Sequence, residues 1–139
     1  MSTIPASAKI GFLLLITSQS LHSLEEFYFS LWEVWAPARF VSGLVSEDLS
    51  FGFAIVNSAI AVLGFWCYLV PIRRSAPGAI LIVWFWVLLE LINSIGHALM
   101  AIAGNNYFPG LYTAPLLFGV ACFVGIRLVR GRKASGIDR

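Results

Sequence analysis

The sequence predicts an all-α membrane protein, a single domain over residues 1–139 in which four transmembrane helices form one bundle. Hydrophobic residues make up 59% of the chain and charged residues only 12%, whereas about a quarter of a typical soluble domain is charged. The hydrophobic residues fall into four separate blocks, each long enough to cross a hydrocarbon layer about 30 Å thick as a helix. The sequence lacks a glycine-rich phosphate loop, a nucleophile elbow and a Cys-x-x-Cys pair, which mark many soluble enzymes.

The first two blocks are expected to form an outgoing and a returning helix. The first, residues 9–35, is too long for a removable signal peptide, and no small-x-small cleavage pattern follows it. We expect it to end at Ala36-Pro37, because proline interrupts the hydrogen bonding of a helix. The second covers residues 49–70, and Asp48 just before it is a suitable N-terminal cap.

The last two blocks each follow a Pro-Gly pair. The third block, residues 78–103, begins at the Pro77-Gly78 pair, and the fourth, residues 111–129, begins after Pro109-Gly110. Proline fixes one backbone dihedral and glycine permits a positive φ, so both pairs are typical of turns. Pro109 and Gly110 are therefore expected to be structural residues of the loop between the third and fourth spans.

The basic residues predict the orientation of the bundle. With four crossings, both termini and the loop between the second and third spans lie on one side, which holds all basic residues except Arg39. By the positive-inside rule both termini are expected in the cytoplasm, and we expect a multi-pass protein of the plasma (inner) membrane of a prokaryote. Because topology accounts for these charges, nucleic acid is not an expected partner.

Two adjacent carboxylates, Glu25 and Glu26, lie inside the first span. On insertion scales a charge at the centre of a bilayer costs about 2.5–3.5 kcal/mol, so a functional site should compensate for them. His22 lies within about 60° of both on an ideal helix. In the third span Glu90, Asn93 and His97 share a similarly narrow face.

The two polar faces should meet in the outer half of the membrane. The first and third spans run in the same direction, and the helical rise places His22 and Glu90 about 18–20 Å from their cytoplasmic ends. His97 follows at about 28 Å, below the loop over residues 105–110. We therefore expect one polar site between these spans, roofed by this loop. Tyr107 in the loop could be an interfacial anchor or could point its hydroxyl at His97.

The motifs carried by these residues resemble a known family. The sequence contains His22-x-x-Glu25-Glu26, then Asn93-x-x-x-His97, and after nine further residues Tyr-x-Pro-Gly, which starts at Tyr107. It is similar in all three motifs to the HXXEE-motif membrane proteins, which have no established activity. The resemblance implies that the functional set is His22, Glu25, Glu26, Asn93, His97, Tyr107, Pro109 and Gly110. Its spacing also favours a Tyr107 hydroxyl that points at His97. Glu90 lies outside the motifs and is included for its helical position.

The first chemical hypothesis is a metal-assisted, hydrolase-like membrane enzyme. His22 and Glu26, one turn apart, could hold a divalent metal ion such as zinc together with His97 and leave a fourth position for water. Glu25 would act as a general base or orient a ligand, and Asn93, Tyr107 and Glu90 would bind substrate.

The second hypothesis needs no metal and no other cofactor. Two neighbouring carboxylates cannot both ionise easily in a low dielectric, so Glu25 or Glu26 should keep its proton. A carboxylic acid beside a neutral His22 or His97 could protonate an alkene or shift a double bond, as an isomerase does. The arrangement is similar in architecture to the emopamil-binding sterol isomerase group, which also has His and Glu one turn apart.

Two further classes stay open. Intramembrane Glu and His residues are common in proton-coupled transporters, and a bundle this small would then need a homodimer. Otherwise the chain would bind a hydrophobic ligand, or the polar groups would only join helices. Two glutamates exceed what joining helices requires, so the favoured hypothesis is an enzyme that acts on a lipid-like or apolar molecule reaching the site through the bilayer.

Overall fold

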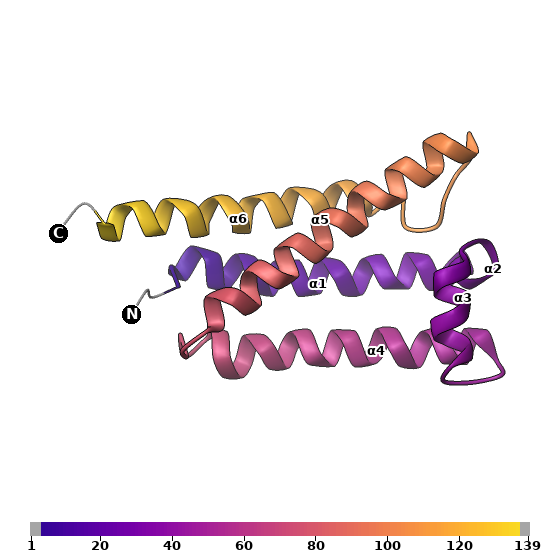
Figure 1. Cartoon of the computed structure of the whole chain (residues 1–139), viewed down its shortest axis with the longest axis horizontal. Coiled ribbons are helices and arrows are strands. Elements are labelled where there is room, and N and C mark those ends of the chain that lie inside the picture. Colours follow the sequence, from indigo (N-terminus) through magenta and orange to yellow (C-terminus); the bar gives the residue numbers. More distant parts are fainter. Residues whose placement is uncertain (1–3, 137–139) are drawn as a thin grey trace.

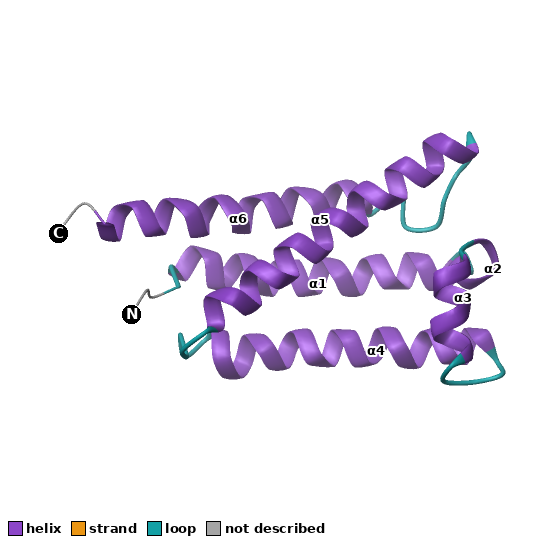
Figure 2. Ribbon diagram, in the orientation of Figure 1, coloured by secondary structure: helices purple, strands orange, loops and turns teal. Residues whose placement is uncertain are grey.

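The computed structural model describes residues 4–136, and the regular secondary structure of the described chain consists of helices joined by loops and turns (Figures 1 and 2). The elements follow one another as α1 (Ala6–Tyr28), α2 (Leu31–Val34), α3 (Ala36–Gly43), α4 (Leu49–Cys67), the π-helical segment η1 (Tyr68–Ile72), α5 (Ala79–Gly104) and α6 (Ala114–Gly136). The all-α class predicted from the sequence is confirmed.

Three helical stretches in the described chain are long and apolar enough to cross a membrane: Leu49–Ile72, Ala79–Gly104 and Ala114–Gly131. They correspond to the second, third and fourth predicted spans. α1 has 23 residues, about 34 Å at 1.5 Å per residue. It is long enough to be a fourth span, and it is more polar than the others because it carries the His22, Glu25 and Glu26 motif.

The first helix ends earlier than predicted. α1 stops at Tyr28 rather than at residue 35, because Ser30 adopts a left-handed conformation with φ 53°. The chain then turns back in the short helices α2 and α3, and Pro37 lies in the first turn of α3, where proline is tolerated. Leu31, Trp32 and Ala38 pack with Phe53 of α4 in a small separate core, which removes them from a continuous span.

α1 lies between α4 and α6, while α5 packs on α6 and η1 (Figure 1). Phe12, Leu15 and Ile16 of α1 are fully buried in the main core. The close approach of α1 to α4 needs a glycine, because a Cβ on Gly64 would lie 2.8 Å from Ile16 Cδ1. By contrast, the backbones of α4 and α5 come close at few points.

The ends of the bundle carry different elements. One end of the bundle holds the start of α1, the C-terminal part of α6 and the turn between η1 and α5 (Figure 1). At this end Lys9 Nζ donates a hydrogen bond of 2.9 Å to the carbonyl of Arg73. α3 and the loop over residues 105–113 lie at the opposite end. The position of the first end in the cytoplasm stays a prediction.

The predicted cap of the second span is confirmed. Asp48 Oδ1 accepts hydrogen bonds from the backbone N–H groups of Ser50 and Phe51, at 2.9 and 3.2 Å. The Ser50 hydroxyl also donates to it, at 2.7 Å. These donors hold the pKa of the Asp48 carboxyl below its usual value, the Ser50 hydroxyl most of all. The Asp48 cap therefore defines the start of α4 at Leu49.

Candidate functional site

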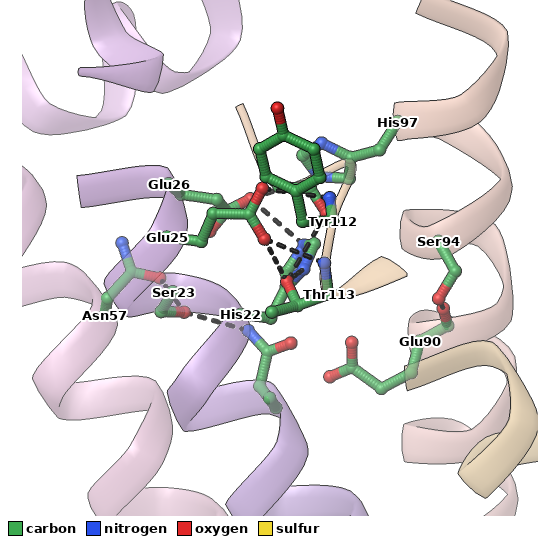
Figure 3. A network of polar contacts seen from close by, with 12 residues as sticks. His22, Ser23, Glu25, Glu26, Asn57, Glu90, Ser94, His97, Tyr112 and Thr113 are labelled. Atoms are coloured by element: carbon green, nitrogen blue, oxygen red, sulfur yellow. Dashed lines mark hydrogen bonds and ion pairs between the residues drawn. The ribbon is translucent and has the colours of Figure 1, made fainter. Parts of the chain in front are cut away.

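His22, Glu26 and His97 form one buried cluster (Figure 3). Glu26 Oε1 lies 3.4 Å from His22 Nε2 and 3.1 Å from His97 Nε2. One nitrogen or oxygen from each residue lies within 4.8 Å of those of the other two. The two imidazole rings meet edge to face, with centroids 4.6 Å apart. The structure thus brings together three of the predicted site residues.

The helical spacing within α1 brings His22 and Glu26 together, and the loop before α6 packs against His22 and His97. His22 and Glu26 are four residues apart, so they share a face of α1. His97 comes from α5, and the backbone at Gly110 packs against both imidazoles. A Cβ on Gly110 would lie 2.7 Å from His97 Nδ1 and 2.8 Å from His22 Cε1. Gly110 also has φ 96°, so two independent constraints select glycine there.

Glu25 points into different surroundings from Glu26. Its Oε1 accepts hydrogen bonds from the Tyr107 hydroxyl at 2.6 Å and from the backbone N–H of Tyr112 at 3.0 Å. Its Oε2 accepts from the backbone N–H of Thr113 at 2.8 Å and from the Thr113 hydroxyl at 2.6 Å. Glu25 therefore ties α1 to the loop and to the N-terminus of α6, whose dipole favours a negative charge.

The expected contact between Tyr107 and His97 is not made, because the Tyr107 hydroxyl donates to Glu25. Burial raises the pKa of Tyr107, and the neighbouring Glu25 carboxylate raises it further. Tyr107 also stacks on Tyr112, with ring centroids 4.7 Å apart, and meets Phe29 edge to face. The phenol keeps its proton and acts as a donor that anchors the loop.

The Thr113 hydroxyl links Glu25 to His22, and this link defines the tautomer of the imidazole. Glu25 has four donors around it, which is the environment of an ionised carboxylate that can only accept. The Thr113 proton therefore goes to Glu25, and the Thr113 oxygen accepts from Nδ1–H of His22, 2.8 Å away. A neutral His22 protonated on Nδ1 carries its lone pair on Nε2.

That lone pair faces an acceptor. His22 Nε2 is buried and has no hydrogen-bond partner among the described residues, and the nearest charged atom is Glu26 Oε1 at 3.4 Å. A lone pair and a carboxylate oxygen repel each other unless a cation lies between them. The three residues could thus hold a metal ion or a proton between them.

A cavity of about 480 Å³ opens beside the cluster and is lined by residues of α1, α2, α3, α4, α5 and the loop. Most of its wall is apolar, with Trp35, Phe53 and Phe108 among the larger side chains. The polar residues of the lining are Gln19, Glu26, Ser42, Asn57, Glu90, Asn93 and His97. Since α4 and α5 scarcely touch, the cavity occupies the space between them.

Glu90 and Asn93 lie on the cavity wall and not in the His22, Glu26 and His97 cluster. Glu90 is 1% exposed, and Figure 3 shows its carboxyl group directed from α5 toward α1. With its amide nitrogen oriented toward Glu90, Gln19 donates to the two carboxyl oxygens at 2.8 and 3.3 Å. Ser23 donates to Asn57 beside this pair, at 2.9 Å.

Two residues of the site were missed from the sequence. Thr113 stands directly before α6, and its place ahead of an apolar run is a capping signal that could have singled it out. Gln19 lies one turn before His22 on the same face of α1, and a buried amide in a span should have a partner.

The comparisons with known proteins give one match. A family model described as a protein of unknown function with HXXEE motif matches residues 13–124. No curated protein and no solved structure matches the chain.

Proposed function

The chain belongs to the HXXEE family, and we propose that it is a membrane-embedded enzyme in which His22, Glu26 and His97 hold a divalent metal ion such as zinc. The substrate would be a lipid-like molecule that occupies the adjacent cavity. The chemistry would be hydrolase-like.

The observation that carries the proposal is the geometry of the three ligand atoms. Two ligands of a tetrahedral zinc ion with bonds of about 2.0–2.1 Å lie about 3.3 Å apart. His22 Nε2 and His97 Nε2 lie 3.4 and 3.1 Å from Glu26 Oε1. Two imidazoles and one carboxylate are also a common ligand set of catalytic zinc, in which the fourth position takes water or substrate.

The residues around the ligands support the same proposal. A ligating histidine usually donates its other ring N–H to an oxygen, which orients the ring and raises its basicity. His22 does so through Thr113, and Thr113 in turn donates to Glu25. Glu25 is then a positioning residue and not the general base, because its four donors leave it no free lone pair directed at a substrate.

A metal ion at this position would polarise a carbonyl or lower the pKa of a bound water. The protein residues would do the rest. Glu26 and His97 are on the cavity wall, so substrate can reach them. Asn93, also on the wall, can bind a substrate carbonyl through its amide, and Phe108 packs beside His97 and keeps water away from the cluster.

The route for an apolar substrate is lateral. Ile92 and Met100, on the α5 side of the cavity, are 72% and 45% exposed. In a membrane these side chains would face acyl chains, so a molecule dissolved in the bilayer could enter without crossing water. This supports a lipid-like substrate over a soluble one.

A metal-free acid and base pair is the second candidate. A proton shared by Glu26 and the imidazoles would satisfy the same facing lone pairs. A protonated Glu26 on the wall of an apolar cavity could then protonate an alkene in the manner of an isomerase. The two candidates differ only in the cation that occupies the cluster.

Elemental analysis of the purified protein separates them. The protein would be prepared with an affinity tag that contains no histidine and without chelators. We expect about one zinc or similar ion per chain in the wild type, and its loss in His22→Ala, Glu26→Gln and His97→Ala. Glu47→Gln, an exposed residue far from the cluster, is the matched control. A folded wild-type protein that binds no metal, even after incubation with zinc, would favour the acid and base pair.

A further inference from the structure

Glu90 is a second acidic group on the wall of the cavity, outside the His22, Glu26 and His97 cluster. It belongs to none of the HXXEE motifs and is 1% exposed, yet it lines the cavity. With its amide nitrogen turned toward Glu90, Gln19 donates to the carboxyl group at 2.8 Å, and the Asn93 side chain is a second donor to it. Glu90 does not belong to the three-residue ligand group, so the proposed metal does not account for it.

Two amides do not saturate a carboxyl group. Its two oxygens have up to about four lone-pair directions, and their burial away from water is unfavourable unless hydrogen-bond partners fill them. No lysine or arginine lines the described part of the cavity. The missing donor would therefore come from the molecule that fills the cavity.

We propose that the cavity selects an apolar molecule with a hydrogen-bond-donating head group, a hydroxyl or an amine, and that Glu90 with Gln19 binds this head. The inference rests on the proposed function in taking this cavity as the substrate site. It deepens that function by naming the substrate class, lipophilic alcohols and amines rather than acidic lipids.

Charge is the reason for the selectivity. Among the described residues, the cavity wall carries the carboxyl groups of Glu26 and Glu90 and the imidazole of His97, with no lysine or arginine. A fatty acid or a phosphate head bound at Glu90 would place two acidic groups together in a low dielectric, outside the three-residue group that would hold the metal ion. A hydroxyl or ammonium group would instead donate to Glu90, so that repulsion excludes one class and attraction favours the other.

Shape supports a molecule of moderate size. A volume of about 480 Å³ lies within the range of pockets that enclose a drug-sized ligand. Leu31, Val41 and Phe53 present only hydrocarbon to it, so the body of the ligand should be apolar. Glu90 and Glu26 both line the cavity and interact electrostatically, so a bound head group would stand near the ligand cluster.

Photoaffinity labelling tests this selectivity without any assay of activity. Three probes would share one alkyl chain with a diazirine near its end and differ in the head group: alcohol, primary amine and carboxylic acid. The protein would be labelled in nanodiscs of zwitterionic lipid, and the labelled residues would be mapped by mass spectrometry. We expect the alcohol and the amine to label cavity residues such as Val41, Ile92 and Met100, and the acid to label them at least about tenfold less.

Glu90→Gln keeps the size of the side chain and removes its charge. We expect labelling of the cavity by the amine to fall by about tenfold in this variant. Glu47→Gln, which removes one exposed charge outside the cavity, should label as the wild type does. Equal labelling by the acid probe in the wild type would overturn the inference, and so would a Glu90→Gln variant that labels normally. The comparison of probes uses the wild type, so it stands even if the variant fails to fold.

The experiment also separates this inference from the proposed function. If the wild type holds a metal ion and the acid probe labels the cavity, the substrate class is wrong and the metal site stands. If the protein binds no metal and the alcohol probe labels the cavity through Glu90, the metal site is wrong and the substrate class stands.

Discussion

The Thr113 hydroxyl donates to the Glu25 carboxylate across 2.6 Å and accepts from His22 Nδ1 across 2.8 Å. Through this single hydroxyl Glu25, the first acid of the HXXEE motif, is linked to His22, the histidine of the same motif. Glu25 and Glu26 are adjacent in sequence and have different roles: one orients His22 and the loop, and the other meets both imidazoles.

Replacement of Thr113 by Val should weaken the metal site without unfolding the bundle. Valine has the shape of threonine and no hydroxyl, so His22 loses the acceptor that orients it. Loss of such an outer partner typically lowers metal affinity by about 10–100-fold. Competition with a zinc chelator would measure this. Thr113→Ser, which keeps the hydroxyl, should stay within a few-fold of the wild type, and a Thr113→Val variant with unchanged affinity would refute the link.

Gly110→Ala should disrupt the cluster. The added methyl group would lie 2.7 Å from His97, and alanine is strained at φ 96°. Backbone strain of this kind costs about 1–3 kcal/mol before any steric clash is counted. Thermal unfolding in detergent and metal content should both decrease. Gly119→Ala in α6 is the control, because a Cβ there meets nothing within 4 Å. Similar stability of the two variants would show that the loop does not pack against the imidazoles as described.

Glu25→Gln should release the loop over residues 105–113. A glutamine amide presents N–H groups to neighbours that are all donors, so about two hydrogen bonds would be lost, at roughly 1.5–3 kcal/mol for each bond to a charged group. Hydrogen exchange of the loop amides would detect the change. Glu26→Gln should leave the exchange of this loop unchanged and abolish metal binding. Slow exchange of the Tyr112 and Thr113 amides in Glu25→Gln would contradict the anchoring role.

The stability that Tyr107 contributes should depend on pH in a defined direction. Its folded pKa is raised above the ordinary value of 10.0 by burial and by Glu25. The unfolded chain therefore loses this proton first, so the contribution is complete below pH 10 and decreases as the pH rises above it. The melting temperatures of the wild type and Tyr107→Phe should differ by a constant amount from pH 7 to pH 9 and converge toward pH 11. A difference that widens at alkaline pH would contradict the donor role of the phenol.

Much of the fold could be predicted from the sequence because hydrophobic block length and turn residues act locally. The second, third and fourth spans begin within a few residues of the Asp48, Pro77-Gly78 and Pro109-Gly110 signals. The end of the first helix could not be predicted. Ser30 has no intrinsic preference for a positive φ, and the packing of residues 31–38 on α4 is a tertiary effect.

Some residues of the site could likewise be predicted from the sequence, and the partners of others could not. His22 and Glu26 follow from helical periodicity, and the approach of His97 follows from two spans that run in the same direction. The partners of Tyr107 and Thr113 depend on the path of a loop whose sequence specifies turns but not their direction. For that reason the distinction between the two adjacent glutamates became visible only in three dimensions.

X-ray absorption spectroscopy of the metal-loaded protein tests the central claim most directly. Zinc held by His22, Glu26 and His97 should show two imidazole nitrogens at about 2.0–2.1 Å, one carboxylate oxygen at about 2.0–2.2 Å and one further light ligand. A spectrum dominated by sulfur, or one with oxygen ligands and no imidazole, would contradict the account.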